Sequence, residues 1–258
     1  MTTTLRSTAG RVARVNGPLV EVTGLSGTAM FEVVELGTDR LPGEIVAISG
    51  DRVTVQAYEY TGGLAPGAPA LARREPLSAL LGPHLLGGVF DGLLRPLAGA
   101  GDRLAPAARA AVEVDRSWRF APVVTAGQMV EAGESLGSTV AGPGSASHPV
   151  LVPPGLHGRV DSIRPSGPVR LDTVVATVGG REVGLAGTWP VRRPRPFRNR
   201  LDAIEPLVTG QRVIDLLLPV PRGGTAGVPG GFGTGKTVLL QQIAKWAEAD
   251  VVIYVGCG

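Results

Sequence analysis

The chain carries the stretch Gly230-Gly231-Phe232-Gly233-Thr234-Gly235-Lys236-Thr237, which fits the pattern G-x-x-x-x-G-K-[ST] of a phosphate-binding loop. In such a loop the glycines let successive backbone N–H groups turn toward phosphate oxygens. A helix that begins directly after the loop adds the positive end of its dipole to the same site. The stretch therefore predicts that this part of the chain folds as an α/β nucleotide-binding domain.

The residues that follow the loop support this interpretation. Lysine occurs only twice in the chain, so a chance match is expected in roughly one of 200 chains of this composition. Residues 237–249 place Leu239, Ile243 and Trp246 on one face of a helix without glycine or proline. Residues 251–255, VVIYV, predict a buried parallel strand. The order loop, helix, strand favours a phosphate-binding loop over a glycine-rich turn that merely caps an ordinary helix.

The motif assigns a role to each fixed position of the pattern. Lys236 is the candidate catalytic residue, because its charge would neutralise the β- and γ-phosphates of a nucleoside triphosphate; the family resemblance described below makes this ATP, with ADP as its product. Thr237 is the candidate Mg²⁺ ligand through its hydroxyl. Backbone N–H groups of residues 233–237 would hold phosphate oxygens. The candidate nucleotide-binding residues are Gly230, Gly231, Phe232, Gly233, Thr234, Gly235, Lys236, Thr237 and Val238.

Composition excludes several other classes of protein. The 258 residues are 43% hydrophobic, enough for a sizeable core in one or two domains, and no apolar run is long enough to span a bilayer. The N-terminus lacks the apolar stretch of a secretory signal. The single cysteine, Cys257, excludes an intramolecular disulfide and fits a reducing cytoplasm. The histidines share no metal-ligand spacing, so no zinc site is predicted. They are His84, His148 and His157.

Basic residues do not indicate a nucleic-acid-binding protein. The formal net charge is only +3, and the one dense basic run lies at residues 192–200, RRPRPFRNR. Two prolines break this run and only one aromatic residue accompanies it, whereas a nucleic-acid surface favours interleaved aromatics on a recognition fold. A solvated connector or a subunit-contact segment is the favoured interpretation.

The rest of the chain predicts a multidomain β plus α/β protein. Residues 1–75 contain short alternating strands with turn signals and predict a small β-barrel. Residues 76–110 predict a connector with one or two short helices before residue 98 and an Ala/Gly/Pro-rich linker at 98–110. Residues 111–185 predict an inserted β-sandwich. Residues 186–258 form the start of the phosphate-loop domain, with a turn at Thr209-Gly210 leading into a short helix.

The strand spacing in the inserted domain is similar to that of biotinyl or lipoyl carriers. A carrier of that type needs an exposed lysine at a hairpin tip, and residues 117–178 contain no lysine. The carrier hypothesis therefore fails, and a structural insertion remains.

Taken together, these segments resemble the N-terminal part of the catalytic A subunit of V-type/A-type rotary ATPases, over essentially all 258 residues. The inserted sandwich matches the bulge domain that separates this subunit from its F-type relatives. Within the loop, the family usually has proline in place of Gly231 and serine in place of Thr234. Nucleotide affinity is expected to shift while the site is retained. The most specific matching pieces are Gln56-Ala57-Tyr58-Glu59, Thr61-Gly62-Gly63-Leu64, Phe90-Asp91-Gly92, Arg95-Pro96-Leu97, Trp189-Pro190-Val191-Arg192, residues 206–215 and residues 223–258.

The resemblance implies an ATP-binding protein that couples ATP synthesis or hydrolysis to proton or sodium transport. It implies B subunits of an alternating hexamer and central stalk subunits as partners, no nucleic acid, and a cytoplasmic position that meets the membrane only through the ion-translocating sector. In the family, a water-activating glutamate follows Cys257-Gly258, so we expect the chain as given to be truncated and not to hydrolyse ATP alone. The alternatives are a non-catalytic structural or regulatory module and another hexameric NTPase, such as an export ATPase or an RNA helicase. The inserted domain speaks against the latter two.

Overall fold

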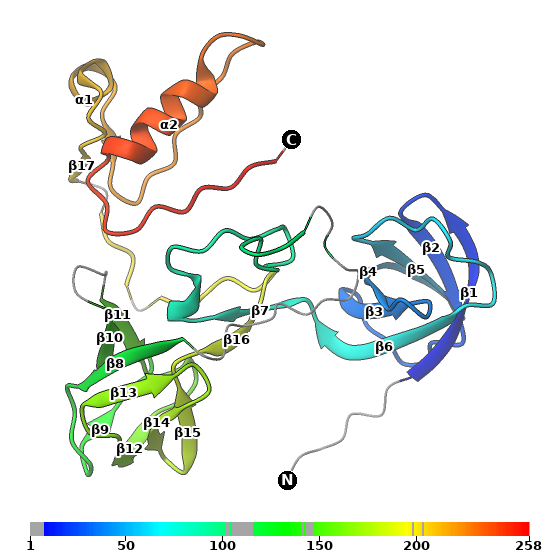
Figure 1. Ribbon diagram of the computed structural model, residues 1–258, viewed down its shortest axis with the longest axis horizontal. Coiled ribbons are helices and arrows are strands. Elements are labelled where there is room, and N and C mark those ends of the chain that lie inside the picture. Colours follow the sequence, from blue (N-terminus) through cyan, green and yellow to red (C-terminus); the bar gives the residue numbers. More distant parts are fainter. Residues whose placement is uncertain are drawn as a thin grey trace. The chain divides into compact units, whose positions relative to one another are not determined.

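The computed structural model describes residues 8–101, 104, 116–140, 142, 147–197, 199–202 and 204–257. The described residues up to Arg195 form one compact unit, and those from Pro196 onward form a second (Figure 1). Most of the predicted 98–110 linker lies outside the described residues. The first unit contains a barrel and a sandwich, and the second contains the phosphate loop.

The N-terminal barrel is a closed antiparallel sheet in the order β1-β2-β5-β4-β3-β6. Two-residue connections join two of its hairpins, with Asn16 paired to Leu19 and Ser49 paired to Arg52. Alternating residues fill the interior, as β5 shows, where Val53 is buried and the residue before it is exposed. The prediction of a small β-barrel is confirmed. The strands are β1 (Thr8–Asn16), β2 (Leu19–Thr23), β3 (Glu32–Leu36), β4 (Leu41–Ser49), β5 (Arg52–Ala57) and β6 (Pro69–Pro76).

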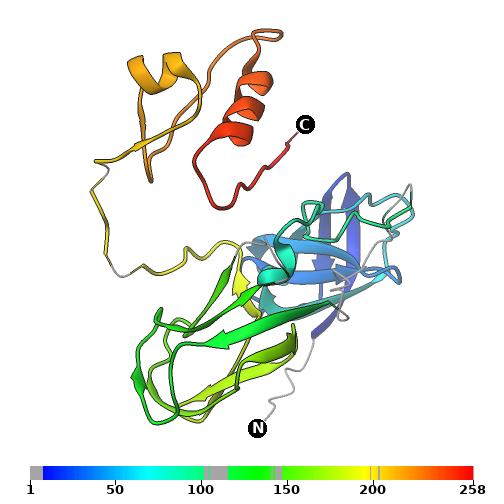
Figure 2. The same cartoon turned by 60° about the vertical axis from the view of Figure 1, so that its left-hand side comes forward.

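The second half of the first unit is a sandwich of two four-stranded antiparallel sheets (Figure 2). One sheet has the order β11-β10-β8-β13 and the other β15-β14-β12-β9. Leu136 of the first sheet packs in one apolar cluster with Val160 of the second, so the two sheets share a core. The predicted sandwich is confirmed. Its strands are β8 (Ser117–Pro122), β9 (Met129–Val130), β10 (Ser135–Val140), β11 (His148–Leu151), β12 (Gly158–Ile163), β13 (Gly167–Arg170), β14 (Val174–Val178) and β15 (Arg181–Gly184).

The connector after the barrel differs from the sequence prediction. The expected short helix is absent from residues 78–81, which form strand β7 (Ser78–Leu81) and pair antiparallel with β16 (Gly187–Pro190). The only helical turn described in residues 76–97 is a 3-10 turn, η1 (Pro83–Leu85). The prediction was wrong because the apolar run is broken at Gly82-Pro83, and its backbone groups are satisfied by a strand more than 100 residues later in the sequence.

The second unit contains two α-helices, α1 (Arg212–Leu217) and α2 (Lys236–Trp246), and a short ladder between β17 (Pro206–Leu207) and β18 (Val220–Pro221). The helix predicted for residues 237–249 is therefore formed, although it ends earlier. Residues 251–255 form no strand and are exposed, because no described residue pairs with their backbone. Among the described residues, no helix is both long enough and apolar enough to span a bilayer.

Candidate functional site: the phosphate-binding loop

The loop and helix α2 are continuous, and glycine makes their junction possible. Gly233 has a φ of 77° and Gly235, the residue before the helix, has a φ of 83°. Both values lie in the left-handed region, which residues other than glycine rarely adopt. The chain thereby reverses and starts the helix within two residues, so Lys236 and Thr237 occupy its first turn.

The backbone of the loop has unused hydrogen-bond donors. From Gly231 to Val238, no backbone N–H group donates to another group of the described chain, and the first bond of the helix runs from the Leu239 N–H to the Gly235 carbonyl at 2.9 Å. The loop residues are exposed, so these donors face solvent. A run of free N–H groups at the positive end of an 11-residue helix is a ready anion site.

The Lys236 ammonium folds back over the loop. Its Nζ donates to the carbonyl oxygens of Gly230 at 2.6 Å and Gly231 at 2.5 Å. Thr234 Oγ1 donates to the same Gly231 carbonyl at 2.9 Å. A Cβ added at Gly230 would lie 2.6 Å from Thr234 Oγ1, so any larger residue there would push the Thr234 hydroxyl away from the Gly231 carbonyl. The positive charge thus lies beside the free N–H groups, on a stem flexible enough to reach a phosphate.

The remaining predicted site residues lie where the motif places them. Thr237 is exposed, and its hydroxyl makes no hydrogen bond within the described chain. Phe232 is fully exposed and Val238 is exposed on the helix, so neither forms a pocket wall with the described residues. No cluster of three or more His, Cys, Asp or Glu side chains suited to a metal occurs in the described parts of the chain. A Mg²⁺ ion here would rely on the Thr237 hydroxyl and nucleotide phosphates, a donor set that Mg²⁺ accepts.

The carboxylate of Asp215, to which the sequence assigned no role, fixes the backbone of residues 209 and 210, which lie against α2. Asp215 Oδ1 accepts hydrogen bonds from the Thr209 N–H at 2.9 Å and the Thr209 hydroxyl at 2.7 Å, and its Oδ2 accepts one from the Gly210 N–H at 3.1 Å. These bonds, chiefly the one from the Thr209 hydroxyl, lower the pKa of the Asp215 carboxyl. A Thr-Gly pair five to six residues before an Asp, at a predicted helix start, was the signal that could have revealed these hydrogen bonds.

Residues 208–210 contact the C-terminal end of α2. A Cβ at Gly210 would lie 2.7 Å from the Trp246 Cβ, and the Glu248 N–H donates to the Val208 carbonyl at 3.0 Å. Gly210 has a φ of 76°, which also favours glycine. The far end of the helix that carries the loop thus contacts residues 208–210, whose backbone Asp215 holds at Thr209 and Gly210.

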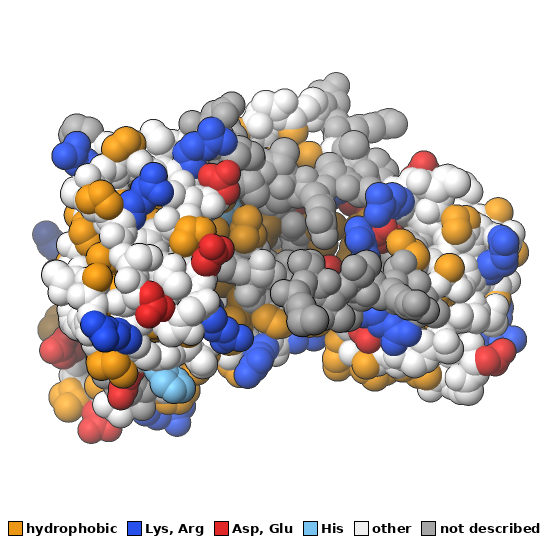
Figure 3. All heavy atoms as spheres, turned by 90° about the horizontal axis from the view of Figure 1, so that it is seen from below, with side chains coloured by type: hydrophobic (Ala, Val, Ile, Leu, Met, Phe, Trp, Pro, Cys, Tyr) orange, Lys and Arg blue, Asp and Glu red, His pale blue; other side chains and the backbone are white. Residues whose placement is uncertain are grey.

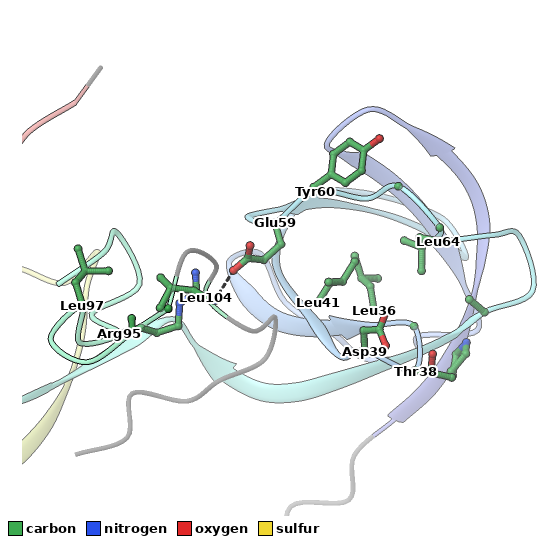
Figure 4. A pocket seen from close by; sticks show the side chains of 17 residues that line it. Leu36, Thr38, Asp39, Leu41, Glu59, Tyr60, Leu64, Arg95, Leu97 and Leu104 are labelled. Carbon is green, nitrogen blue, oxygen red and sulfur yellow. Dashed lines mark ion pairs between the residues drawn. The ribbon is translucent and has the colours of Figure 1, made fainter. Parts of the chain in front are cut away.

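The first unit has a cavity of about 1150 Å³, and it does not involve the phosphate loop (Figure 4). The Arg95 guanidinium lies at its wall, with Nη1 2.6 Å from Glu59 Oε1 and Nε 2.7 Å from Asp91 Oδ2. In the sequence, the pieces containing Asp91 and Arg95 stand out only as family signatures, and nothing in them predicts an ion cluster with Glu59.

Charges of both signs are mixed on one face of the molecule. On the face shown in Figure 3, Lys and Arg side chains are interspersed with Asp and Glu. In the first unit several arginines pair with carboxylates, as Arg73 and Arg40 both do with Glu35. The free N–H groups of residues 231–238 and the nearby Lys236 ammonium make the loop the functional site that the geometry supports.

Three family models match the chain in the order of its domains. The "ATP synthase alpha/beta family, beta-barrel domain" matches residues 12–72. The "ATPsynthase alpha/beta subunit barrel-sandwich domain" matches residues 109–192, and the "ATP synthase alpha/beta family, nucleotide-binding domain" matches residues 210–258. Each model corresponds to one part of the architecture described above.

Curated relatives match nearly the whole chain. The "V-type ATP synthase alpha chain" of Anaeromyxobacter dehalogenans strain 2CP-1 is 54% identical over 256 residues, which is 97% of this chain and 44% of the relative. An A subunit of the A-type ATP synthase of Methanospirillum hungatei and that of Sulfolobus acidocaldarius are each 46% identical, over 96% of this chain and 44% of the relative. The chain thus spans less than half the length of these relatives. Their identity to it and the three matching domains together show that the chain belongs to the ATP synthase alpha/beta family.

Proposed function

We propose that this chain provides the ATP- and ADP-binding loop of the catalytic A subunit of a V/A-type rotary ATPase. Such a protein couples ATP synthesis or hydrolysis to the transport of protons or sodium ions. The observation that carries the proposal is the run of free backbone N–H groups from Gly231 to Val238 at the start of α2, with the Lys236 ammonium beside it. The names of the relatives support the same conclusion.

Each loop residue then has a physical task. Backbone N–H groups of residues 233–237 bind phosphate oxygens, and the positive end of α2 strengthens each of these bonds. Lys236 leaves the Gly230 and Gly231 carbonyls and moves its charge to the β- and γ-phosphates. Thr237 contributes its hydroxyl to Mg²⁺, which when bound neutralises phosphate charge. Positioning and charge stabilisation are the main contributions that a protein makes to phosphoryl transfer.

The assembly is also part of the proposal. The barrel forms a collar in a hexameric head, in which copies of this protein alternate with B subunits, and central stalk subunits contact the head. The complex lies on the cytoplasmic side and meets the membrane only through its ion-translocating sector, without nucleic acid. The three family models and their order support this placement. We propose residues 1–75, 76–110, 111–185 and 186–258 as the domain boundaries, with residues 187–195 at the start of the last domain packed on the first compact unit.

Nucleotide binding to the full chain tests the proposal. A fluorescent ADP analogue is titrated in the presence and absence of Mg²⁺ into the wild type, Lys236→Ala and the matched control Lys245→Ala. Lys245 is the only other lysine and lies over the Trp246 ring, 5.1 Å from its centre. We expect saturable binding, a loss of affinity of about tenfold or more in Lys236→Ala, corresponding to one charge-assisted contact, and less than about a twofold change in the control.

Two results would refute the proposal. One is the absence of saturable nucleotide binding by a folded wild-type chain. The other is equal affinity of the two lysine variants, which would show that the loop is a structural turn. The second outcome would favour the alternative of a non-catalytic assembly module that keeps the barrel and the sandwich.

A further inference from the structure

The segment that follows the sandwich is ordered along its length. Residues 187–195, here called the strap, begin as β16 paired with β7. Beyond that ladder, the Val191 N–H donates to the Leu77 carbonyl at 2.9 Å. The Trp189 indole N–H donates to the Arg193 carbonyl at 2.7 Å. The first part of the basic run, expected to be a solvated connector or a subunit-contact segment, is therefore attached to its own unit.

One arginine of the strap pairs with a buried carboxylate on the outer face of the barrel strand β4. Glu44 of β4 is only 1% exposed. Arg192 donates from Nε to Glu44 Oε1 at 2.9 Å and from Nη2 to Oε2, so the pair is bidentate. The Tyr58 hydroxyl donates to Glu44 Oε2 at 3.0 Å. A buried carboxylate without a cation is costly, and here the cation arrives from a residue 148 positions away.

The arginine itself is held from the solvent side. Its guanidinium stacks over the Phe31 ring, 4.8 Å from the ring centre, while its side chain remains 57% exposed. Hydrogen bonds from Arg192 are the main cause that lowers the pKa of Glu44, and they outweigh the effect of burial. The charged and titratable groups that act on Glu44 are Arg192 and Tyr58. The pair is therefore ionised at neutral pH and loosens only in acid, below the ordinary pKa of a glutamate.

The remaining arginines of the strap fold back onto it. The guanidinium groups of Arg193 and Arg195 lie 5.4 Å and 4.6 Å from the centre of the Trp189 ring. Arg195 is also the last residue of the first unit. The contacts within the strap therefore extend to the last residue of the first unit.

We propose that the Arg192–Glu44 pair is a latch that holds the strap against the barrel, so that the connection to the second unit starts at Pro196 and not after β16. Opening the latch would free residues 191–195, which would lengthen the connection by up to about 17 Å in an extended chain. The latch thereby sets how much of the chain is available to join the two units. The inference concerns the first unit and does not depend on nucleotide binding.

Hydrogen exchange of the full chain, read by mass spectrometry, tests the latch. Glu44→Gln keeps the size of the side chain and removes its charge. We expect the N–H groups of Val191 and Arg193, which bond to carbonyls of Leu77 and Pro190, to exchange about tenfold faster or more. The matched control is Glu182→Gln, an exposed residue of β15, which should leave the strap unchanged.

A second pair of variants keeps the test decisive if Glu44→Gln also disturbs the barrel. Arg192→Gln alters only the exposed partner and should release the strap. The double variant Glu44→Gln, Arg192→Gln removes both charges and should leave the strap equally loose while the N–H of Ala57, which bonds to the Pro18 carbonyl, stays protected. Unchanged strap exchange in Arg192→Gln would overturn the proposal. Equal acceleration of strap and barrel in the double variant would also overturn it, because the pair would then serve only barrel stability.

Discussion

Replacing Arg95 by methionine removes the charge from a buried ion cluster while keeping a chain of similar length. Arg95 is only 8% exposed, and its guanidinium pairs with the carboxylate of Glu59 (Figure 4) and with that of Asp91. Asp91 also accepts the Arg95 and Leu93 backbone N–H groups, at 2.7 Å and 3.0 Å. The substitution leaves Glu59, at the wall of the cavity, and Asp91 without their shared cation.

The expected cost follows from the burial of the three groups. Breaking a fully buried ion pair by removing one partner costs about 3–5 kcal/mol. The side chains of Asp91 and Glu59 are 17% and 21% exposed, so water offsets part of this penalty. We therefore expect a destabilisation of about 2–3 kcal/mol, equivalent to about a 30-fold or larger change in the opening equilibrium.

Hydrogen exchange near the cluster measures this change directly. The probes are the Asp91 N–H, which bonds to the Arg95 carbonyl at 3.0 Å, and the Leu97 N–H, which bonds to the Val89 carbonyl at 2.9 Å. The control is Arg52→Met, which breaks the exposed pair of Arg52 with Glu21. Such a surface pair contributes less than about 1 kcal/mol, so exchange should change little.

A small effect would refute the reasoning. If Arg95→Met changes exchange at the two probes by less than about threefold, or no more than Arg52→Met does, then the cluster is solvated and burial does not set its energy. The pKa of Asp91 gives an independent check. Burial raises it, but the hydrogen bonds from Arg95 and Leu93 and the charge of Arg95 together outweigh burial and hold it below its ordinary value, so Arg95→Met should raise it.

Two further predictions concern the sandwich and the short helix. Gly137→Ala should destabilise the sandwich by about 2 kcal/mol, because the added methyl would lie 2.6 Å from the Phe120 ring. The control Gly167→Ala places its methyl in open space, so the midpoint of its urea unfolding, followed by tryptophan fluorescence, should stay close to that of the wild type. Equal midpoints for the two variants would contradict this prediction. The pKa of Asp215 is lowered, chiefly by the Thr209 hydroxyl, so wild-type α1 should keep its exchange protection above the ordinary carboxyl pKa and lose it as the pH falls through the lowered value. Asp215→Asn should show weaker protection without this pH dependence, and an unchanged pH profile would refute a stabilising role of the Asp215 hydrogen bonds.

The backbone turn of the phosphate loop and the start of α2 could be predicted, because the residues that determine them are consecutive in the sequence. Glycine at Gly233 and Gly235 permits the left-handed backbone, and the helix must start where Lys236 and Thr237 stand. The free N–H groups follow from the helix start itself, which always leaves its first donors unpaired. The alternation in the barrel strands and the two-residue hairpin at residues 50–51 are local in the same sense.

Features with distant partners could not be predicted in this way. Residues 78–81 have an apolar pattern that suits a helix or a strand, and the pairing with β16 decided between them. The predicted strand at 251–255 is not formed, because a strand needs a hydrogen-bonded neighbour and the described residues provide none.

The sequence by itself determined the phosphate-loop motif, the barrel, the sandwich and the family that they indicate, since periodicity, turn residues and motif spacing are local properties of a chain. Only the tertiary structure decided that Arg192 reaches Glu44, that Arg95 joins Asp91 to Glu59, and that the strap is held to the barrel. The physical reason is the same in each case. The energy of a buried charge depends on which opposite charge the fold brings beside it, and sequence separation does not encode that distance.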